Sequence, residues 1–536
     1  QAILVKGMAS PSIAPAKTRM AQLAPSRGTV PRHAPQPQVA APPRAAVVPA
    51  GAAGQPLAAQ TRPGLSGPLV CAAGALAASA LAARRRRGGS RAPRSRAARR
   101  AALLPVKIET KGVPVYLYAP LHEVEEQARD QLISLAESPL PVGHVAAMPD
   151  VHMGKGVAIG AVFASEKYVC PNAVGVDIGC GMCAVPVEGL YKSDLSEAQL
   201  RQIQQLLKER IPTSFDSHPE SLSWAQRTLK DITAECPPTG YLEARIAKEA
   251  RIAKQLGTLG GGNHFIELVY SEGDEQVWCM LHSGSRNVGN TTAEHYDRIA
   301  GQQGHYLRGV AGSLNYLEIA SEEGQGYLKD MQWCQAYARE NRRSMLELMV
   351  ESVEEVSRRR ADMSRAVNAH HNFCQCEKCR IVDTKTGEVT ERDLWVTRKG
   401  ATSARPGQYG IIPGSMGVGS YIVKGRGAQG SWQSCSHGAG RRMSRRKAVK
   451  EIPQEEFEHA MRGIICDTNK AVRDEAPQAY KDLGKVLQNQ SELVEVQHRL
   501  LPLVNVKGFE DKPRRRGGGG RGGGGRRRRG NSKARS

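Results

Sequence analysis

The sequence predicts a mixed α+β protein with one folded domain in the middle of the chain. Two observations lead to this fold class. Short β-rich runs and long amphipathic stretches intermix from about Leu103 to Gly508, without the regular strand–helix–strand rhythm of a doubly wound parallel sheet. The two ends have compositions that cannot bury enough apolar surface to fold. We therefore expect a leader over residues 1–102, a folded domain over 103–508 and a tail over 509–536.

Within the core, strands and helices are expected from the spacing of apolar residues. Strands are predicted at Val157–Phe163, Ala173–Ile178, Val277–Leu281, Leu394–Thr397 and Ser420–Val423. Helices are predicted at Leu195–Glu209, Leu242–Leu256, Thr292–Gln302, Gly326–Arg359 and Glu455–Arg473. Ser193 or Ser196 is available as the N-cap of the first helix.

The positive charge is concentrated at the ends of the chain. The net charge is +23, of which residues 1–108 carry +17 and residues 509–536 carry +9, leaving −3 for the 400 residues between them. A nearly neutral core argues against a uniformly basic nucleic-acid coat protein, so any polyanion site in the core must be local. Aromatic residues make up only 5% of the chain, which argues against a broad base-stacking platform.

The leader is acid-free and rich in Ala, Pro, Ser and Arg, a composition typical of organelle transit peptides. We expect an organelle protein, located in a plastid rather than in a mitochondrion. The alternative is a cytoplasmic protein whose leader is a basic arm with no targeting function. The longest apolar run, Leu69–Ala83, is shorter than the ~20 residues of a membrane span, so we expect no membrane segment in the mature form. The Arg/Gly tail Pro513–Ser536 is expected either to associate with RNA or to be a solvated tail.

Residues that can bind metal ions gather in Gly-rich turns of the core. Asp177 and Cys180 are three apart in a Gly-bounded turn, and His264 follows three consecutive glycines. His282 ends a strand of buried type, and His371 lies in the sequence VNAHHNFC. Each of these residues alone is a weak signal, but together a carboxylate, a thiolate and three imidazoles predict a metal pocket with N, O and S ligands.

Two further loops suit phosphate binding. Val396–Gly425 is rich in Gly, Ser and basic residues and could cradle a nucleotide, although no GxxxxGK[ST] P-loop is present. In Ser434–Ala448, His437 stands before a Gly-Ala-Gly turn and a basic stretch. His437 could be a nucleophile on phosphorus; the alternative is a buried histidine at a tight turn.

Six motifs together resemble one family. VGVDIGCGM, GNHFIE, LHSGSR, HHN, RKGATSARPGQYGIIPGSMG and CSHGAGR occur in the order and spacing of the RtcB family of RNA ligases. KGVPVYL near the start of the core and VEVQHRLLPLVNVKG at its end also look like that family, so the similarity runs from about Lys107 to Gly508. The resemblance implies a single mixed α/β catalytic domain with a deep dinuclear metal cleft.

The resemblance also implies a metal site and a nucleotide site. Two Mn²⁺ ions would share Cys180, with Asp177 and His264 on one ion and His282 and His371 on the other. GTP would be the co-substrate, and a histidine in CSHGAGR would become guanylylated. That nucleophile is His437, and the residues at the family's GTP or GMP contacts are Asn263, Phe265, Glu267, Asn372, Pro413, Gly414, Ser415, Met416, Ser420, Gly438, Ala439, Gly440 and Lys507.

The implied reaction joins RNA 3′-phosphate or 2′,3′-cyclic phosphate ends to 5′-hydroxyl ends through an RNA–pp–G intermediate, in tRNA splicing or RNA repair. We expect RNA, such as tRNA halves, as the partner, with an archease-like activator, and a monomeric enzyme. Asp150 is expected to assist the 5′-hydroxyl. RNA-phosphate contacts are expected from Arg286, Arg398, Lys399, Arg405, Arg441 and Arg445.

Two rival functions remain open from the sequence. A metal-dependent phosphodiesterase would use the same ions with water as nucleophile, and would need neither His437 nor Lys507. A non-catalytic RNA-binding protein would depend on the basic ends of the chain. One departure from the family pattern is a cluster of Cys374, Cys376 and Cys379. These thiols could hold zinc with Cys435 or Cys183 as a fourth ligand, but we expect free thiols in a surface loop.

Overall fold

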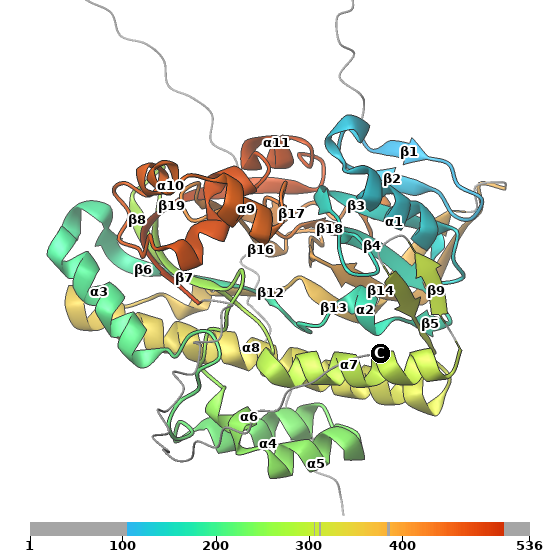
Figure 1. The fold of residues 1–536 in the computed structure, drawn as a ribbon, viewed down its shortest axis with the longest axis horizontal. Coiled ribbons are helices and arrows are strands. Elements are labelled where there is room, and N and C mark those ends of the chain that lie inside the picture. The colour runs from blue at the N-terminus through green and yellow to red at the C-terminus, as the bar shows by residue number, and fades with distance from the viewer. Residues whose placement is uncertain (1–103, 305, 310–311, 383–385, 509–536) are drawn as a thin grey trace, which may run out of the picture. The chain divides into compact units, whose positions relative to one another are not determined.

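The computed structural model describes residues 104–508, apart from 305, 310–311 and 383–385 (Figure 1). The predicted leader, its apolar run and the Arg/Gly tail lie outside the described residues. Across the part that is described, no helix has the length and apolar character needed to span a bilayer. The described chain has the mixed α/β architecture that the sequence predicts.

Two sheets form the framework. The first has six strands in the order β1-β2-β3-β4-β14-β13, and the second has seven antiparallel strands in the order β12-β6-β8-β7-β19-β17-β16. Smaller pairs are β9 with β10, β5 with β11, and β15 with β18. The strand bounds are β1 Val106–Ile108, β2 Val115–Leu117, β3 Val142–His152, β4 Ile159–Ser165, β5 Tyr168–Val169, β6 Gly181–Tyr191, β7 Phe265–Ser271, β8 Gln276–Ser283, β9 Tyr306–Gly309, β10 Gly312–Asn315, β11 Leu317–Glu318, β12 Val367–His370, β13 Asn372–Val382, β14 Val389–Lys399, β15 Ala401–Ser403, β16 Tyr409–Pro413, β17 Ser420–Gly425, β18 Ser434–Ser436 and β19 Val494–Lys507.

One long helix supports the seven-stranded sheet. Figure 1 shows α8 running beneath the sheet, with α3 packed across one end of it and α7 beside the other. The helix bounds are α1 Glu126–Ala136, α2 Pro171–Val174, α3 Glu197–Arg210, α4 Ala225–Glu235, α5 Gly240–Lys248, α6 Ala250–Lys254, α7 Arg286–Gln302, α8 Glu322–Ser357, α9 Arg445–Glu451, α10 Gln454–Ala460 and α11 Leu483–Gln488.

The ends and the buried face of α8 follow from its sequence. The Ser321 hydroxyl accepts the Gly324 N–H at 3.0 Å and caps the first turn, and Arg358 ends the helix in the left-handed conformation. Met345 and Met349, four residues apart, lie in the same core cluster as the sheet residues Val185 and Leu281. The helix is therefore held to the underside of β6 and β8 by apolar burial.

Most predicted elements are confirmed. The structure contains the strands predicted near residues 157, 277, 394 and 420 and the helices predicted near 195, 292 and 326. Ser196, rather than Ser193, caps α3, and its hydroxyl and the Gln199 side chain form a capping box. Leu242–Leu256 is two helices, because Glu249 leaves the helical conformation between α5 and α6.

Two predicted elements are wrong. Ala173–Ile178 is not a strand: Pro171 starts the short helix α2, and Gly175 and Gly179 then turn with positive φ values of 101° and 73°. Ala173, Val174 and Ile178 of that run are buried although Val176 is exposed, and these buried apolar residues explain why the run resembles a strand. Glu455–Arg473 is not one helix, because α10 ends at Ala460, Gly463 has a φ of 84° and a 3₁₀ helix follows over Lys470–Glu475.

The three clustered cysteines do not form a surface loop or a zinc site. They lie in β13, where successive residues face opposite sides of the sheet, so Cys374 and Cys376 share one face and Cys379 lies on the other. Cys374 is buried in the cluster that contains Trp333, Cys379 is buried in the cluster that contains Trp432, and Cys376 is exposed. None of the three forms a disulfide, and they cannot converge on one ion, because Cys379 lies on the opposite face of the strand from Cys374 and Cys376.

Candidate active site

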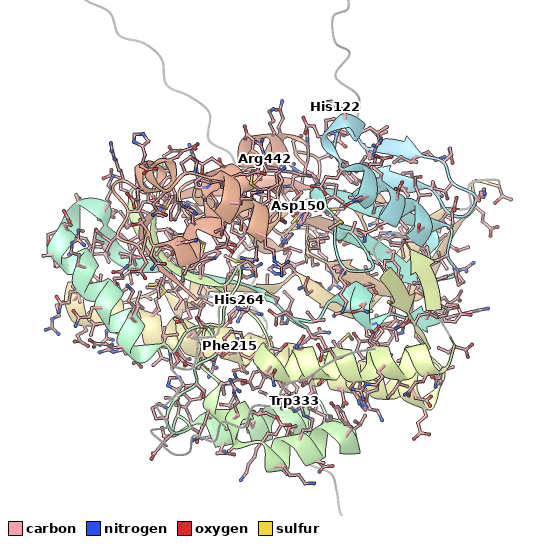
Figure 2. All side chains as sticks on the ribbon, in the orientation of Figure 1. His122, Asp150, Phe215, His264, Trp333 and Arg442 are labelled. Atoms are coloured by element: carbon pink, nitrogen blue, oxygen red, sulfur yellow. The ribbon has the colours of Figure 1, made fainter. Side chains whose placement is uncertain are left out.

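The predicted metal ligands meet at one end of the seven-stranded sheet. Cys180 immediately precedes β6, His264 immediately precedes β7, and His371 immediately follows β12, while His282 lies near the end of β8. The antiparallel register sets His282 opposite Phe265 and Ser283 opposite Gly181. Residues far apart in the chain therefore reach the same edge; Figure 2 labels His264 there, below Asp150.

The ligand atoms lie within contact distance of one another. The Cys180 Sγ is 3.3 Å from the His264 Nε2 and 3.2 Å from the His282 Nε2. The His282 Nε2 is in turn 3.2 Å from the His371 Nε2, and the His264 Nε2 is 2.9 Å from an Asp177 carboxylate oxygen. Cys180 therefore lies between His264 and His282, and these three residues form a buried cluster that could hold a metal ion.

The surroundings of the imidazoles suit a metal site. The Nδ1 of His264 is 2.9 Å from the Leu259 carbonyl oxygen, and the Nδ1 of His282 is 3.0 Å from that of Asn263. Since these carbonyls accept the Nδ1 protons, the Nε2 lone pairs face the cluster. Burial lowers the pKa of His282 and of His371 well below the usual range, which keeps both rings neutral. The His371 Nδ1 is buried with no hydrogen-bond partner among the described residues.

Charge at the cluster also fits a bound cation. Burial acts to raise the pKa of Asp177, but the hydrogen bond and the attraction of His264 outweigh it and bring the pKa to about 2. Burial and Asp177 raise the pKa of the Cys180 thiol well above the usual range, so a thiolate here requires a nearby cation. Asp177 is seated tightly: it accepts the Ser285 N–H at 3.1 Å, and a Cβ on Gly284 would collide with its carboxylate. The donor set suits a borderline divalent ion.

His437 lies beside this cluster and is held by Asp150. The His437 ring centroid is 5.0 Å from that of His371. The His437 Nδ1 is 2.7 Å from an Asp150 carboxylate oxygen, but at an angle outside normal hydrogen-bond geometry, so the contact is chiefly electrostatic. The backbone N–H groups of His437 and Gly438 donate to the same oxygen at 3.2 and 3.3 Å. Burial acts to raise the pKa of Asp150, but the attraction of His437 outweighs it, and the carboxylate stays ionised.

This arrangement corrects the expected role of Asp150. The residue lies in strand β3, and no part of its side chain is exposed. A carboxylate in that position cannot meet an incoming 5′-hydroxyl. It instead orients the His437 ring.

A cavity of about 310 Å³ opens beside His437. Twelve of the thirteen residues predicted to contact a nucleotide line it, and Asn372 is the exception. Among the described residues, the buried Ser415 Oγ and Asn505 Oδ1 have no hydrogen-bond partner. Asn505 donates to the Glu267 carboxylate at 2.8 Å. Burial raises the pKa of Glu267 to about 7, although Asn505 and Lys507 act against this shift.

The sequence missed a buried acid in the cavity wall. Glu475 accepts from the Lys507 Nζ at 3.0 Å, from Arg441 at 3.1 Å and from the Tyr480 hydroxyl at 2.7 Å. Burial acts to raise the pKa of Glu475, but its cationic neighbours bring it to about 2. Arg445 pairs with the same carboxylate. No sequence motif surrounds Glu475, so only the fold identifies it.

A second cavity, of about 260 Å³, is also lined by His437 and by residues of the predicted ligand cluster. Asn372 and Lys399 line it, as do Asp177, Cys180 and His371. The Lys399 Nζ donates to the carbonyl oxygens of Lys155 and Asn172 at 2.6 and 2.9 Å, and burial lowers its pKa to about 8. Asn372 accepts the Gly400 N–H at 2.8 Å.

The residues predicted to contact RNA phosphates differ in their burial and in their location. Arg398 has no exposed surface: it pairs with Glu377 and donates to Ser434 and to the Trp432 carbonyl, so the prediction that it contacts RNA is wrong. The remaining five lie at the two cavities, beside the metal ligands or at the surface. Lys399 lines the second cavity, Arg441 and Arg445 line the first, Arg286 donates to Thr258 and Ser214, and Arg405 is exposed.

The fold and the site together define an enzyme in which two cavities are lined by one histidine, His437, and by members of a cluster of side chains that could hold a metal ion. The family model described as "tRNA-splicing ligase RtcB" matches residues 131–508. The chain belongs to this RtcB family of RNA ligases, as the six motifs implied.

Several relatives match about three quarters of this chain and nearly all of their own length. The chain is 40% identical over 420 residues to the RNA-splicing ligase RtcB of Escherichia coli strain K12, a match that spans 75% of this chain and 97% of that protein. It is 31% identical over 477 residues to the tRNA-splicing ligase RtcB of Thermococcus kodakarensis, spanning 74% and 95%. It is 30% identical over 440 residues to the RNA-splicing ligase RtcB of Mycobacterium tuberculosis, spanning 70% and 100%.

Proposed function

We propose that this RNA ligase joins RNA 3′-phosphate or 2′,3′-cyclic phosphate ends to 5′-hydroxyl ends, using GTP and two Mn²⁺ ions. Its substrates would be tRNA halves or broken RNA, and we propose that it acts as a monomer with an archease-like activator. The observation that carries the proposal is His437, which lies between a nucleotide-sized cavity and a cluster of buried metal-binding side chains.

The proposed first step is guanylylation of His437. Asp150 engages the His437 Nδ1, which leaves Nε2 as the ring nitrogen that attacks the α-phosphorus of GTP. The new N–P bond forms as the bond to pyrophosphate breaks. Asp177, Cys180, His264, His282 and His371 would hold the ions, which when bound stabilise charge that develops on the phosphate oxygens.

In the second and third steps the guanylyl group moves to RNA and then leaves. The RNA 3′-phosphate attacks the phosphorus on His437, breaks the N–P bond and gives RNA–pp–G. The 5′-hydroxyl then attacks the RNA phosphorus and expels GMP. A 2′,3′-cyclic phosphate would first be opened by water. We propose that the RNA ends enter the second cavity, where Lys399 and Asn372 supply a cation and an amide.

The test is incubation of the full chain with α-labelled GTP and Mn²⁺. An acid-labile, alkali-stable label on the protein is expected, and it should not form without Mn²⁺. A phosphodiesterase acting through water would release the RNA phosphate without labelling the protein, and a non-catalytic RNA-binding protein would do neither. Either result would overturn the proposal.

A further inference from the structure

Directly beneath the ligand cluster, α8 carries two buried polar side chains that the proposed reaction does not use. Asn341 and Arg342 are adjacent in the helix that crosses below the seven-stranded sheet in Figure 1, and both have no exposed surface. Buried polar groups of this kind are costly unless every hydrogen bond is made. The hydrogen-bond partners of Asn341 and Arg342 therefore indicate the role of these two residues.

Arg342 holds the residues next to four ligands. Its guanidinium donates to the carbonyl oxygens of Gly179 and Ser283 at 2.6 and 3.1 Å and lies 3.0 Å from the His370 Nδ1. Gly179 lies between Asp177 and Cys180, Ser283 follows His282, and His370 precedes His371. The Arg342 Nε–H donates to the side-chain oxygen of Asn368 on β12 at 2.8 Å.

Asn341 holds the loops on the other side of the cluster. Its side-chain oxygen accepts the N–H groups of Gly257 and Thr258 at 2.8 and 3.2 Å. Its amide donates to the carbonyl oxygens of Thr258 and Gly284 at 3.1 Å each. Thr258 precedes Leu259, the residue whose carbonyl holds the His264 ring, and Gly284 lies against the Asp177 carboxylate.

The charge on Arg342 has no ion-pair partner. Within the described ranges, no carboxylate lies at salt-bridge distance from its guanidinium. Burial lowers the pKa of Arg342 to about 10, so it is still a cation at neutral pH. A buried cation paired only with carbonyls and an imidazole costs stability, which apolar packing at the same position would not. Its benefit must therefore lie in the loops that it fixes.

We propose that Asn341 and Arg342 are positioning residues that hold the ligand-bearing loops in place before the ions bind. This inference rests on the proposed function, since it concerns the same two-ion site. Because α8 is a rigid element packed on the sheet, two adjacent side chains can fix strand ends that are more than 180 residues apart in the chain. Partners of metal ligands typically contribute ~10–100-fold to metal affinity.

The experiment uses the full chain with the substitutions Arg342→Lys and Asn341→Asp. Arg342→Lys keeps the charge but cannot reach several acceptors at once. Asn341→Asp keeps the shape but removes the amide donor. The matched control is Arg343→Gln, the next residue of α8, which is exposed and pairs only with Glu340 and Glu347. The readouts are metal-free circular dichroism and melting, Mn²⁺ affinity by calorimetry, and the Mn²⁺ concentration for half-maximal labelling by GTP.

We expect both variants to fold without metal and to bind Mn²⁺ roughly 10–100-fold more weakly than wild type, with labelling restored at correspondingly higher Mn²⁺. The control should behave as wild type. Mn²⁺ affinity within twofold of wild type in both variants would overturn the inference. So would unfolding of both variants in the absence of metal, which would make the pair a general stabilising element.

The two proposals can fail separately. If wild type binds Mn²⁺ but is not labelled by GTP, the ligase mechanism fails while the Mn²⁺ affinities of the variants still decide the role of α8. If wild type is labelled normally and the variants bind Mn²⁺ as tightly as it does, only the positioning role fails.

Discussion

At the scale of single residues, the contact between His437 and Asp150 determines which chemistry His437 can perform. Replacing His437 with Ala should abolish labelling by GTP and reduce ligation of 3′-phosphate ends by roughly 10³-fold or more, because the nucleophile is lost. A pre-activated RNA–pp–G substrate should still be sealed, since its chemistry comes after the His437 step. Gel analysis of both substrates checks this. Normal labelling of the variant would mean that another residue is the nucleophile.

Cys180 is the proposed shared ligand, and its Sγ lies 3.3 Å from the His264 Nε2 and 3.2 Å from the His282 Nε2. Cys180→Ser should therefore cost more activity than any single His→Ala change in the site, and more than the ~100-fold expected from disturbing a partner of a ligand. Without the thiolate, two bound cations would repel each other with less compensation. Metal analysis should find fewer than two ions per chain. Two tightly bound ions and a near-wild-type rate would show that Cys180 is not shared.

The raised pKa of Glu267 leads us to expect that nucleotide binding depends on pH. Its pKa of about 7 means that the buried carboxyl is largely protonated below neutral pH. If it accepts hydrogen bonds from N–H groups of the guanine base, GMP affinity should rise as the pH increases from 6 to 8. Calorimetry at both values checks this, with Glu267→Gln as the control that should bind weakly without the pH dependence. Affinity that falls over this range would rule out an accepting carboxylate.

The Glu267 carboxyl also makes the free energy of unfolding depend on pH. The folded-state pKa is above the ordinary value for Glu, so the folded chain binds more protons than the unfolded chain between about pH 4.5 and 7. The contribution of Glu267 to the free energy of unfolding therefore decreases as the pH rises through that window. Bound nucleotide that pairs with the carboxylate would offset this loss.

At the scale of secondary-structure elements, β13 shows how strand geometry overrides a motif. The spacing of Cys374, Cys376 and Cys379 resembles a zinc site, but alternation along the strand puts Cys379 on the opposite face from Cys374 and Cys376, and of the three only Cys376 is exposed. We expect a thiol reagent to modify Cys376 in the native protein and the other two only on unfolding. Mass spectrometry after brief labelling checks this, and Cys376→Ser should lose the adduct without losing activity. Tightly bound zinc released by the reagent would contradict it.

Elements were predictable where periodicity and capping agreed. The existence of α3 follows from its apolar residues at helical spacing, but the sequence left Ser193 and Ser196 open as its N-cap, and the structure selects Ser196 through a capping box with Gln199. Ala173–Ile178 was not predictable as a helix and turn, because Ala173, Val174 and Ile178 are buried by tertiary packing and not by the periodicity of a strand. The positive φ values of Gly175 and Gly179, which break the run, are visible only in the structure.

At the scale of the whole molecule, the distribution of charge predicts that the ends are dispensable for catalysis. A chain spanning Leu103–Gly508 should be labelled by GTP at a rate similar to full length, since every site residue lies within it. Its RNA affinity and the steepness of its salt dependence should both fall, because it displaces fewer counterions. Binding measured at several salt concentrations checks this. Loss of GTP labelling on truncation would show that an end takes part in the chemistry.

The leader carries a separate expectation. If residues 1–102 are a transit peptide, protein recovered from its source organelle should lack them, and N-terminal sequencing checks this. Full-length protein in the mature pool would instead make the leader a basic functional arm. Neither outcome changes the assignment of the catalytic core.

The sequence by itself determined the family, because the family depends on short motifs whose residue types and spacing reflect local chemistry. The same motifs supplied the predicted metal ligands and the predicted nucleophile His437. It could not determine the partners of those residues. Asp150 is 287 positions from His437, Glu475 has no motif, and Asn341 and Arg342 read simply as part of a long helix. Such contacts join segments far apart in the chain, so they exist only once the sheet register and the packing of α8 bring those segments together. The burial of Arg398 was decided in the same way, since a sequence shows its charge but not the Glu377 that neutralises it.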